Sequence, residues 1–266
     1  MQDWYAFKDP RQFYYGAYVQ HRARLQDSAE SNYAFFEKRG LAANISAEVK
    51  RKIITCFLPF RYVEQTANLH MMSGSAYGYG TVITQACIFA AMDRLGMAQY
   101  ISRIGLLLDG NTGESLQQAK DVWMHDPAWQ PLRRFLEDSF VVMDPVELFV
   151  LQNVVLDGLL YPLVYETIID DVLSAKGGTS VAMLTQFMTD WFAETKKWAD
   201  ATVKTAAAES DENKAILTKW ITEWRDRAAA ALLPVARIAL GDRTDELVGE
   251  VVQQFNARMA KAGVAL

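Results

Sequence analysis

Apolar residues recur three and four positions apart along almost all of the 266 residues, and no stretch alternates as a run of strands would. In a helix this spacing gathers apolar side chains on one face, which can then pack into a core. The sequence therefore predicts an all-α protein. It contains no internal repeat and no linker long enough to divide it, so residues 1–266 are predicted to form one domain.

Breaks in this periodicity divide the chain into predicted helices. An Asp-Pro pair introduces the first and Gly40 stops it, while Ser46 is a candidate cap for the second. Pro59 is expected to kink or break the second helix, and the glycines of residues 73–80 are expected to loosen the next junction. The predicted helices cover residues 11–39, 46–73, 81–95, 97–108, 114–124, 132–175 with a junction at 143–145, 180–208, 214–240 and 246–262.

Charge and composition exclude several classes of protein. The chain is 51% hydrophobic and 22% charged, which is typical of a globular protein and not of a disordered one. Its formal net charge is −5, with acidic and basic residues interspersed and no block of Lys or Arg of the kind that holds a phosphate backbone. Nucleic acid is therefore not an expected partner.

Cysteine usage and the most apolar segment indicate a cytoplasmic protein. Cys56 and Cys87 lie singly in apolar helical sequence, as buried thiols do in a reducing compartment. The N-terminus has no basic segment followed by an apolar run, which predicts that there is no secretory signal. Residues 149–165 are the most apolar stretch, but four polar or helix-breaking residues make it poor material for a membrane span.

The segment 145–173 is apolar nearly all the way round, which places it at the centre of a helical bundle. Val150, Val154, Asp157 and Tyr161 fall on one stripe of it, because they are four, three and four residues apart. Asp157 is therefore expected to be buried. A buried carboxylate has to be paired, hydrogen-bonded, protonated or bound to a metal.

Inward-facing carboxylates in a bundle suggest a di-iron site, in which two helices each supply a Glu and two others each supply a Glu-x-x-His motif. Residues three apart share a helix face, so both side chains of the motif reach the same metal pair. No glutamate here has a histidine three positions later, and no Asp-x-x-His occurs. Glu64 and His70 are six residues apart, which turns them about 240° from each other, so they are not expected to share an ion.

The other histidines offer no site either. Asp121 and His125 are four residues apart, but they lie where a helix is expected to end and where a cation satisfies the helix dipole. His21 is flanked by Gln20 and Arg22 and is expected to be exposed or packed in an interface. The chain also lacks a Gly-x-Ser-x-Gly motif and a phosphate-binding glycine loop. The residues alone offer no active site.

Aromatic residues near the N-terminus are the one positive signal. Seven aromatics and two arginines fall close together, a mixture that protein interfaces favour. Packing into the chain's own core is the alternative, although chain ends seldom carry so many aromatics unless something covers them. The candidate interface residues are Trp4, Tyr5, Phe7, Arg11, Phe13, Tyr14, Tyr15, Tyr18 and Arg22.

Long strings of the sequence carry a resemblance to a known family. They are "DPRQFYYGAYVQHRARLQ", "QACIFAAMDRLGMAQYISRIGLLLDG", "WQPLRRFLEDSFVVMDPVEL", "LQNVVLDGLLYPLVY" and "VAMLTQFMTDWFAET". Over nearly its whole length the chain resembles the beta subunit of the bacterial multicomponent phenol hydroxylases, and less specifically the beta subunits of toluene, alkene and methane monooxygenases. The resemblance implies a ferritin-like helical bundle with additional helices.

The resemblance also implies where a lost metal site would lie. Catalytic relatives hold two irons with four glutamates and two histidines from four helices. Laid on that pattern, this chain has no histidine at either Glu-x-x-His motif, and its bundle centre is expected to be packed rather than metallated. The vestigial ligand positions are Glu64 for the first glutamate, Gln85 and Ile88 for the first motif, Asp157 at or beside the third position, and Trp191 and Glu194 for the second motif.

By resemblance, the chain is a non-catalytic subunit that binds no cofactor itself. Its catalytic alpha partner would carry the di-iron centre, and with a small gamma subunit the three would form an oxygenase of two copies each. The assembly would convert phenol or a methylphenol, O2 and NADH to a catechol. A separate reductase with FAD and an iron–sulfur cluster would supply electrons, and a small effector protein would tune the reaction.

Two other functions remain open at this point. A self-sufficient ferritin-like metal oxidase would use Glu64, Asp157 and Glu194, with Asp121 and His125 as further ligands. A helical binding module would need an apolar cavity. Phenol hydroxylase beta subunits carry a longer N-terminal arm than this chain, so any clasp that the arm provides is expected to be absent or trimmed.

Overall fold

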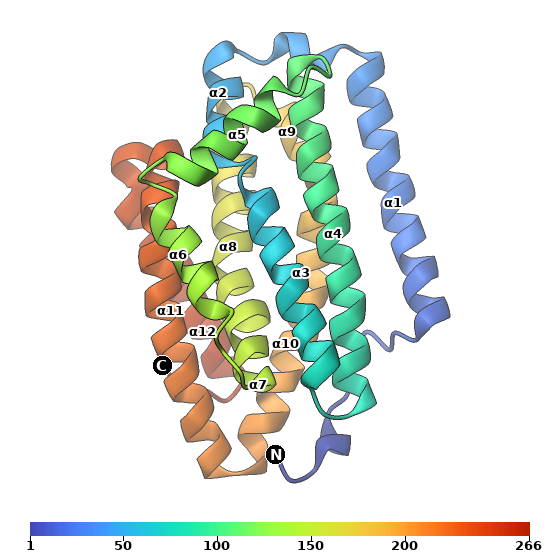
Figure 1. Ribbon diagram of the computed structural model, residues 1–266, viewed down its shortest axis with the longest axis vertical. Helices are drawn as coiled ribbons and strands as arrows, with labels where there is room; N and C mark the ends of the chain where they lie inside the picture. The colour runs from blue at the N-terminus through green and yellow to red at the C-terminus, as the bar shows by residue number, and fades with distance from the viewer.

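The computed structural model describes residues 1–266, and all of its regular elements are helices (Figure 1), which confirms the predicted all-α fold. Short 3-10 turns lie at Trp4–Ala6, Leu41–Asn44 and Gly241–Arg243. The α-helices are α1 (Tyr15–Lys38), α2 (Ala47–Cys56), α3 (Phe60–Tyr77), α4 (Thr81–Asp109), α5 (Glu114–His125), α6 (Gln130–Ser139), α7 (Pro145–Phe149), α8 (Asp157–Tyr161), α9 (Thr179–Leu184), α10 (Gln186–Glu209), α11 (Asp211–Leu240) and α12 (Thr244–Lys261).

One continuous helix, Pro145–Lys176, runs through the centre of the molecule. It consists of α7, α8 and the wider π-helical turns that follow each of them, at Val150–Leu156 and Pro162–Leu173, and it ends in a 3-10 turn at Ser174–Lys176. The π-helical turn tolerates Pro162, which has no amide proton to donate. This is the one helix long and apolar enough to cross a membrane, but 94% of its apolar window is buried inside the protein. It is a core helix, as its all-round apolar character predicts.

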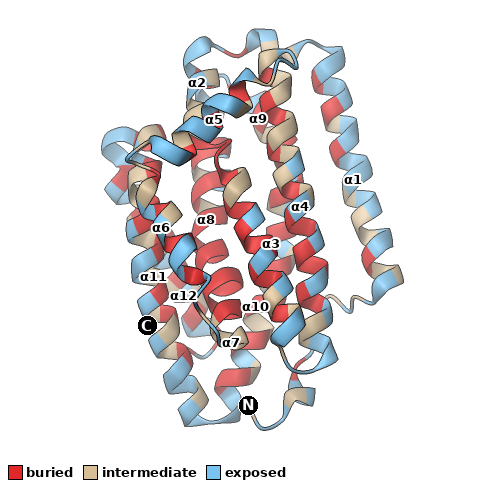
Figure 2. Ribbon diagram, viewed as in Figure 1, coloured by how far each residue is buried: buried red, intermediate tan, exposed pale blue.

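The other long helices surround this central helix. In Figure 1, α3 and α4 lie side by side in front of it, α10 lies behind it, and α11 with α12 lies to its left. The helix α1 runs along the outer edge beside α4, while α2, α5 and α9 close one end. Buried positions face inward on every long helix (Figure 2), and 69 buried residues of the chain form a single hydrophobic cluster.

Several predicted boundaries agree with the structure. Ser46 accepts a hydrogen bond from the Val49 amide and caps α2. The chain breaks at residues 57–59, next to Pro59, as expected. At the junction in 143–145, Asp144 accepts hydrogen bonds from the amides of Val146 and Glu147, which begins the central helix.

Other boundaries were predicted wrongly. Residues 81–95 and 97–108 form one helix, α4, because Gly96 is tolerated inside it. The helix that was predicted to end at residue 73 continues to Tyr77, into the glycine-containing segment. Gly74 lets the helices approach closely there, since a Cβ on it would lie 3.2 Å from the Sγ of Cys87. The predicted helix 180–208 is divided at Thr185, whose hydroxyl bonds the Ala182 carbonyl.

Candidate functional site

A buried group of charges lies at the centre of the bundle, and we call it the inner cluster: Glu64 on α3, Arg94 on α4, and Asp157 and Tyr161 on α8. The guanidinium of Arg94 donates through Nη1 to Glu64 Oε2 at 3.0 Å and through Nη2 to Asp157 Oδ2. The Tyr161 hydroxyl donates to Glu64 Oε1 at 2.9 Å. None of the four residues is more than 2% exposed. One guanidinium therefore lies between two carboxylates that the sequence analysis placed at metal-ligand positions.

Large side chains close the remaining sides of this cluster. The Arg94 guanidinium carbon lies 4.4 Å from the centre of the Trp191 ring, a cation–π contact in a buried site. Met97 is three residues after Arg94 on the same face of α4, and its Sδ lies 3.1 Å from the Tyr161 hydroxyl. The centre of the bundle is therefore filled by side chains.

A chain of hydrogen bonds continues from the inner cluster to the end of α6. Gln152 donates through Nε2 to Asp157 Oδ1 at 2.9 Å, so its Oε1 has to accept. His70 therefore donates to it from Nδ1, at 2.8 Å. The Nε2 of His70 lies 2.8 Å from the Ser139 hydroxyl oxygen, whose one proton can be donated either to it or to the Leu136 carbonyl oxygen 2.6 Å away. Glu64 and His70 share no ion, as expected, but one polar network links them.

Burial and neighbouring charges shift the pKa values of the groups in this network. It raises the pKa of Glu64 and of Asp157, although the positive charge of Arg94 opposes the rise. Burial alone would lower the pKa of Arg94, but the two carboxylates outweigh it and keep the guanidinium charged. Burial also lowers the pKa of His70 to about 4, so the imidazole is neutral at pH 7.

A second charged group, the outer cluster, joins α1 to α4 and α10. It consists of Tyr18, His21, Arg22, Asp93, Trp191 and Glu194. The Asp93 carboxylate accepts hydrogen bonds at 2.8 Å from the Tyr18 hydroxyl, from Arg22 and from the Trp191 indole. Arg22 also donates to Glu194, which pairs with His21 at 2.6 Å. The outer cluster thus repeats the inner arrangement of one guanidinium between two carboxylates, closer to the surface.

The structure corrects part of the predicted ligand register. Gln85 and Ile88 are exposed on α4, so neither faces Glu64 and Ile88 does not fill the bundle centre. Two α4 residues that do face it are Arg94 and Met97, which lie nine positions further along. Glu194 points to the outer cluster instead of the inner one, because Arg22 and His21 hold its carboxylate.

Two of the other predicted positions are buried, as expected. Asp157 and the stripe that contains it are buried, and Trp191 is completely buried against the inner cluster. Sequence reasoning missed Arg94, because an arginine is usually read as a surface residue. One signal was available: Arg94 stands seven residues after Cys87 and three before Met97, on the buried stripe of an apolar helix.

The N-terminal aromatic residues divide into two groups. Phe7 and Tyr18 are buried within the chain, and Trp4 and Phe13 are half-buried. The Arg11 guanidinium pairs with Asp9, and Arg22 belongs to the outer cluster. The remaining residues are exposed and stay candidates for contact with a partner: Tyr5, Tyr14 and Tyr15.

These residues do not fit a di-iron centre. The structure contains no group of three or more His, Cys, Asp or Glu side chains that could hold a metal ion. The two carboxylates that converge are already bridged by Arg94, and no imidazole lies beside them. Asp121 and His125 are exposed at the end of α5, far along the chain from both clusters.

Comparison with known sequences and structures gives consistent matches. A family model described as Methane/Phenol/Alkene Hydroxylase matches residues 1–210. The chain is 61% identical over 264 residues to the phenol 2-monooxygenase oxygenase component MhpL of Acinetobacter pittii (strain PHEA-2), covering 99% of this chain and 78% of that protein. It is 50% identical, with the same coverage, to the oxygenase component DmpL of Pseudomonas sp. (strain CF600).

Solved structures match as well. The crystal structure of xenon-pressurized phenol hydroxylase from Pseudomonas sp. OX1 superimposes with a TM-score of 0.95 at 41% identity, covering 100% of this chain and 80% of the other. The structure of toluene 4-monooxygenase superimposes with a TM-score of 0.82 at 23% identity, covering 89% and 79%, and supports the fold alone. The predicted ferritin-like bundle agrees with both.

Proposed function

The chain belongs to the methane/phenol/alkene hydroxylase family, among the phenol hydroxylase oxygenase components, and from this we propose that it is the non-catalytic beta subunit of such an enzyme. It supports a catalytic alpha subunit that carries the di-iron centre, and a small gamma subunit completes an oxygenase with two copies of each chain. The whole assembly converts phenol, O2 and NADH to catechol. This chain binds no cofactor.

The position of Arg94 is the observation that carries the proposal. A charged guanidinium between Glu64 and Asp157 supplies the positive charge that metal ions supply in a catalytic relative. A cation could enter only by displacing a fully buried side chain that makes five polar or cation–π contacts. The bundle centre therefore supports a structural role rather than oxygen chemistry.

An exposed apolar surface supports association with a partner. On α3 and α4, two helices that pack against each other, apolar residues at helical spacing face outward. Monomeric proteins rarely expose many large apolar side chains together, and interfaces use them. We propose that the alpha subunit covers this surface and the exposed N-terminal tyrosines: Leu69, Met72, Ile88, Met92 and Leu95, with Tyr5, Tyr14 and Tyr15.

The rest of the proposal concerns the wider system. A reductase with FAD and an iron–sulfur cluster and a small effector protein bind transiently to the assembled oxygenase. A reducing cytoplasm suits Cys56 and Cys87, which are both free and buried. The chain is proposed to fold as one domain, because a single hydrophobic cluster extends from Phe7 to Val264.

Iron content tests the proposal most directly. The full chain is expressed alone in iron-replete medium, and its iron is measured beside that of the complex with alpha and gamma subunits. We expect close to zero iron in this chain and iron only in the complex. About two irons per isolated chain, as in a di-iron bundle, would overturn the proposal.

A matched pair of variants then assigns catalysis within the complex. Glu64→Gln keeps the shape of a candidate ligand but removes its charge, and Glu30→Gln does the same to an exposed glutamate on α1. Both variants should retain iron content and phenol hydroxylation per assembled complex. Loss of iron in Glu64→Gln alone would place the metal in this chain.

The two alternative functions receive no support from the geometry. A self-sufficient oxidase would need Glu64, Asp157 and Glu194 to converge, but Glu194 belongs to the outer cluster. A binding module would need an apolar cavity, and the most apolar one, beside Trp4 and Phe149, holds only about 20 Å3. That volume is about the size of one water molecule.

A further inference from the structure

Four methionines of this protein lie at its surface. Methionine is among the residues most often buried, yet four of the ten methionines here are exposed. Met72 and Met92 are 48% and 43% exposed, and Met124 is 38% exposed. The fourth, Met143, lies in the loop before the central helix. Exposure matters chemically, because a peroxide oxidises the thioether of methionine only where solvent reaches the sulfur.

Met72 is on α3 and Met92 is on α4, two helices that lie side by side (Figure 1). Asn68 Nδ2 on α3 donates to the Ala91 carbonyl oxygen on α4 at 2.7 Å. Further along α3, a Cβ on Gly74 would lie 3.2 Å from the Sγ of Cys87. The two helices are therefore antiparallel, and these contacts fix which residues lie opposite each other.

This register brings the two methionines into one apolar strip. Met72 lies level with Ile88, and Met92 lies level with Leu69. Along α4, Met92 is four residues from Ile88 and three from Leu95, so the three side chains share a helix face. All five residues are exposed. Each sulfur is therefore bordered at the surface by leucine or isoleucine, which have no hydrogen-bond donor in their side chains.

Exposed glutamines border the strip on both helices. Gln65 is four residues before Leu69 on α3. On α4, Gln85 is three residues before Ile88, and Gln99 follows at the other end of the strip. An apolar centre with a polar border is the usual arrangement of a protein interface. The methionines therefore lie at the centre of the surface that the alpha subunit is proposed to cover.

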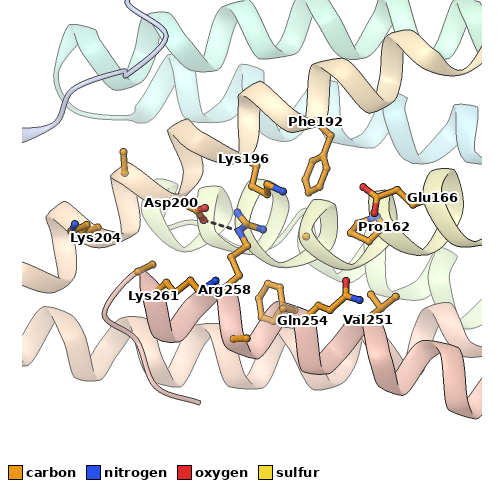
Figure 3. A pocket seen from close by; sticks show the side chains of 15 residues that line it. Pro162, Glu166, Phe192, Lys196, Asp200, Lys204, Val251, Gln254, Arg258 and Lys261 are labelled. Carbon is orange, nitrogen blue, oxygen red and sulfur yellow. Dashed lines mark hydrogen bonds and ion pairs between the residues drawn. The ribbon is translucent and has the colours of Figure 1, made fainter.

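The surface between the central helix, α10 and α12 has the opposite character (Figure 3). Six of the residues that line its pocket are charged, and none is a methionine. Arg258 and Asp200 form an ion pair there, at 2.7 Å. A peroxide would leave the polarity of this surface unchanged, whereas it would change that of the strip.

We propose that Met72 and Met92 are sites of oxidation by hydrogen peroxide, and that the sulfoxides formed there prevent the alpha subunit from binding; this inference rests on the proposed function. The thioether sulfur attacks one oxygen of the peroxide, so that an S–O bond forms and the O–O bond breaks. The sulfur loses two electrons, the peroxide gains them, and its second oxygen leaves as water with both protons. Hydrogen peroxide is the two-electron reduction product of O2, which the proposed assembly consumes.

The effect of the modification follows from the composition of the strip. A sulfoxide oxygen accepts hydrogen bonds, but the leucine and isoleucine side chains beside it donate none. Covering such an oxygen with an apolar partner surface removes its water without replacing the hydrogen bond, which is unfavourable. Oxidation acts on the free chain, because the partner shields both sulfurs after assembly. Chains with oxidised methionines are therefore left out of the complex.

Peptide mass spectrometry after a short exposure to hydrogen peroxide tests the sites. In the free full chain, we expect Met72, Met92 and Met124 to form sulfoxide at similar rates, because their exposed fractions are similar. In the complex with alpha and gamma subunits, oxidation of Met72 and Met92 should slow at least about tenfold, while that of Met124 on α5 should not. Equal rates for Met72 and Met92 in the free chain and the complex would overturn the proposal.

Titration of the alpha subunit with peroxide-treated chain tests the consequence. The treated chain should bind at least about tenfold more weakly than the untreated chain. The double variant Met72→Leu with Met92→Leu keeps apolar side chains of similar volume but has no sulfur at either position. It should bind equally well before and after treatment. Met124→Leu is the matched control, and treatment should weaken its binding as much as it does that of the natural chain.

The outcomes separate this inference from the proposed function. A loss of affinity in the treated double variant equal to that of the natural chain would overturn the assignment of Met72 and Met92. Failure of the untreated chain to bind the alpha subunit would overturn the proposed function itself, and this inference with it.

Discussion

The inner and outer clusters use the same chemistry at two depths. Each places one guanidinium between two carboxylates: Arg94 between Glu64 and Asp157, and Arg22 between Asp93 and Glu194. The inner side chains are at most 3% exposed; in the outer cluster Asp93 is equally buried at 3%, but Arg22 and Glu194 are 11% and 16% exposed. A buried charge that loses its partner cannot be solvated, but one near the surface can. We therefore expect the whole fold to depend on the inner cluster, whereas the outer cluster mainly attaches α1, the outermost helix.

The largest expected effect follows from removing the inner cation. Arg94→Met leaves two carboxylates buried without a partner, and we expect it to lower the free energy of unfolding by about 3–5 kcal/mol. Urea denaturation monitored by circular dichroism measures the loss. A triple variant that adds Glu64→Gln and Asp157→Asn should recover most of it, because no charge remains to be compensated.

The same variant makes a pH prediction. Burial holds the pKa values of Glu64 and Asp157 above those of the unfolded chain, and loss of Arg94 removes the charge that opposes this rise. The folded Arg94→Met variant then binds more protons than its unfolded form, so its stability falls as the pH rises. The loss should be smaller at pH 5 than at pH 8. A loss that does not depend on pH would count against buried carboxylates as its cause.

The next largest effect on stability is expected at His70, which is linked through Gln152 to the inner cluster and has no contact with the outer one. Its pKa falls from 6.5 to about 4 on folding, so its contribution is complete above pH 6.5 and is lost as the pH falls toward 4. The shift corresponds to about 3 kcal/mol. In unfolding experiments from pH 7 to pH 4.5, His70→Gln should flatten this part of the stability profile. His21→Gln, in the outer cluster, should leave it in place.

A smaller effect is expected at the outer cluster. Arg22→Met removes two of the four hydrogen bonds to Asp93 and should cost about 1–2 kcal/mol, because Tyr18 and Trp191 still donate to that carboxylate. Hydrogen exchange should show the amides of α1 opening while those of the central helix stay protected.

The control is Arg103→Met, which breaks the exposed ion pair with Glu30 between α1 and α4 and should lower the stability less. Equal losses in the free energy of unfolding for Arg22→Met and Arg94→Met would contradict the claim that the more deeply buried cluster matters more to stability.

The smallest expected effect is a coupling at Trp191, which belongs to the outer cluster and also contacts the inner one. Trp191 donates its indole N–H to Asp93 and presents its ring to Arg94. Trp191→Phe keeps a ring but removes the donor and part of a completely buried side chain, and should cost about 1–3 kcal/mol. In a double-mutant cycle with Arg22→Met, we expect a coupling of about 0.5–1 kcal/mol, since both changes affect Asp93. A coupling of zero would indicate that the two contacts act independently.

Sequence reasoning reached the fold more easily than the site. Helical periodicity depends on residues close in the chain, so the all-α architecture and the burial of Asp157 followed directly from it. The register of α4 did not, because nothing local distinguishes Gln85 and Ile88 from Arg94 and Met97 as the pair facing Glu64. That choice depends on how two helices pack.

The π-helical turns and the outer cluster also could not be predicted from the sequence. A π-helical turn forms where tertiary packing outweighs the local preference for an α-helix, so residue types alone give little warning of it. Asp93, Arg22 and Glu194 are far apart in the sequence, and each alone resembles an ordinary surface charge. Only the tertiary structure brings them together.

The placement of Arg94 also affects how the protein is made. Proteins whose folding relies on a bound ion depend on its supply and unfold when a chelator removes it. Here the positive charge at the centre is a side chain of the polypeptide, so it is present from synthesis and cannot dissociate or be exchanged. In the role proposed above, folding of this chain therefore does not wait for iron.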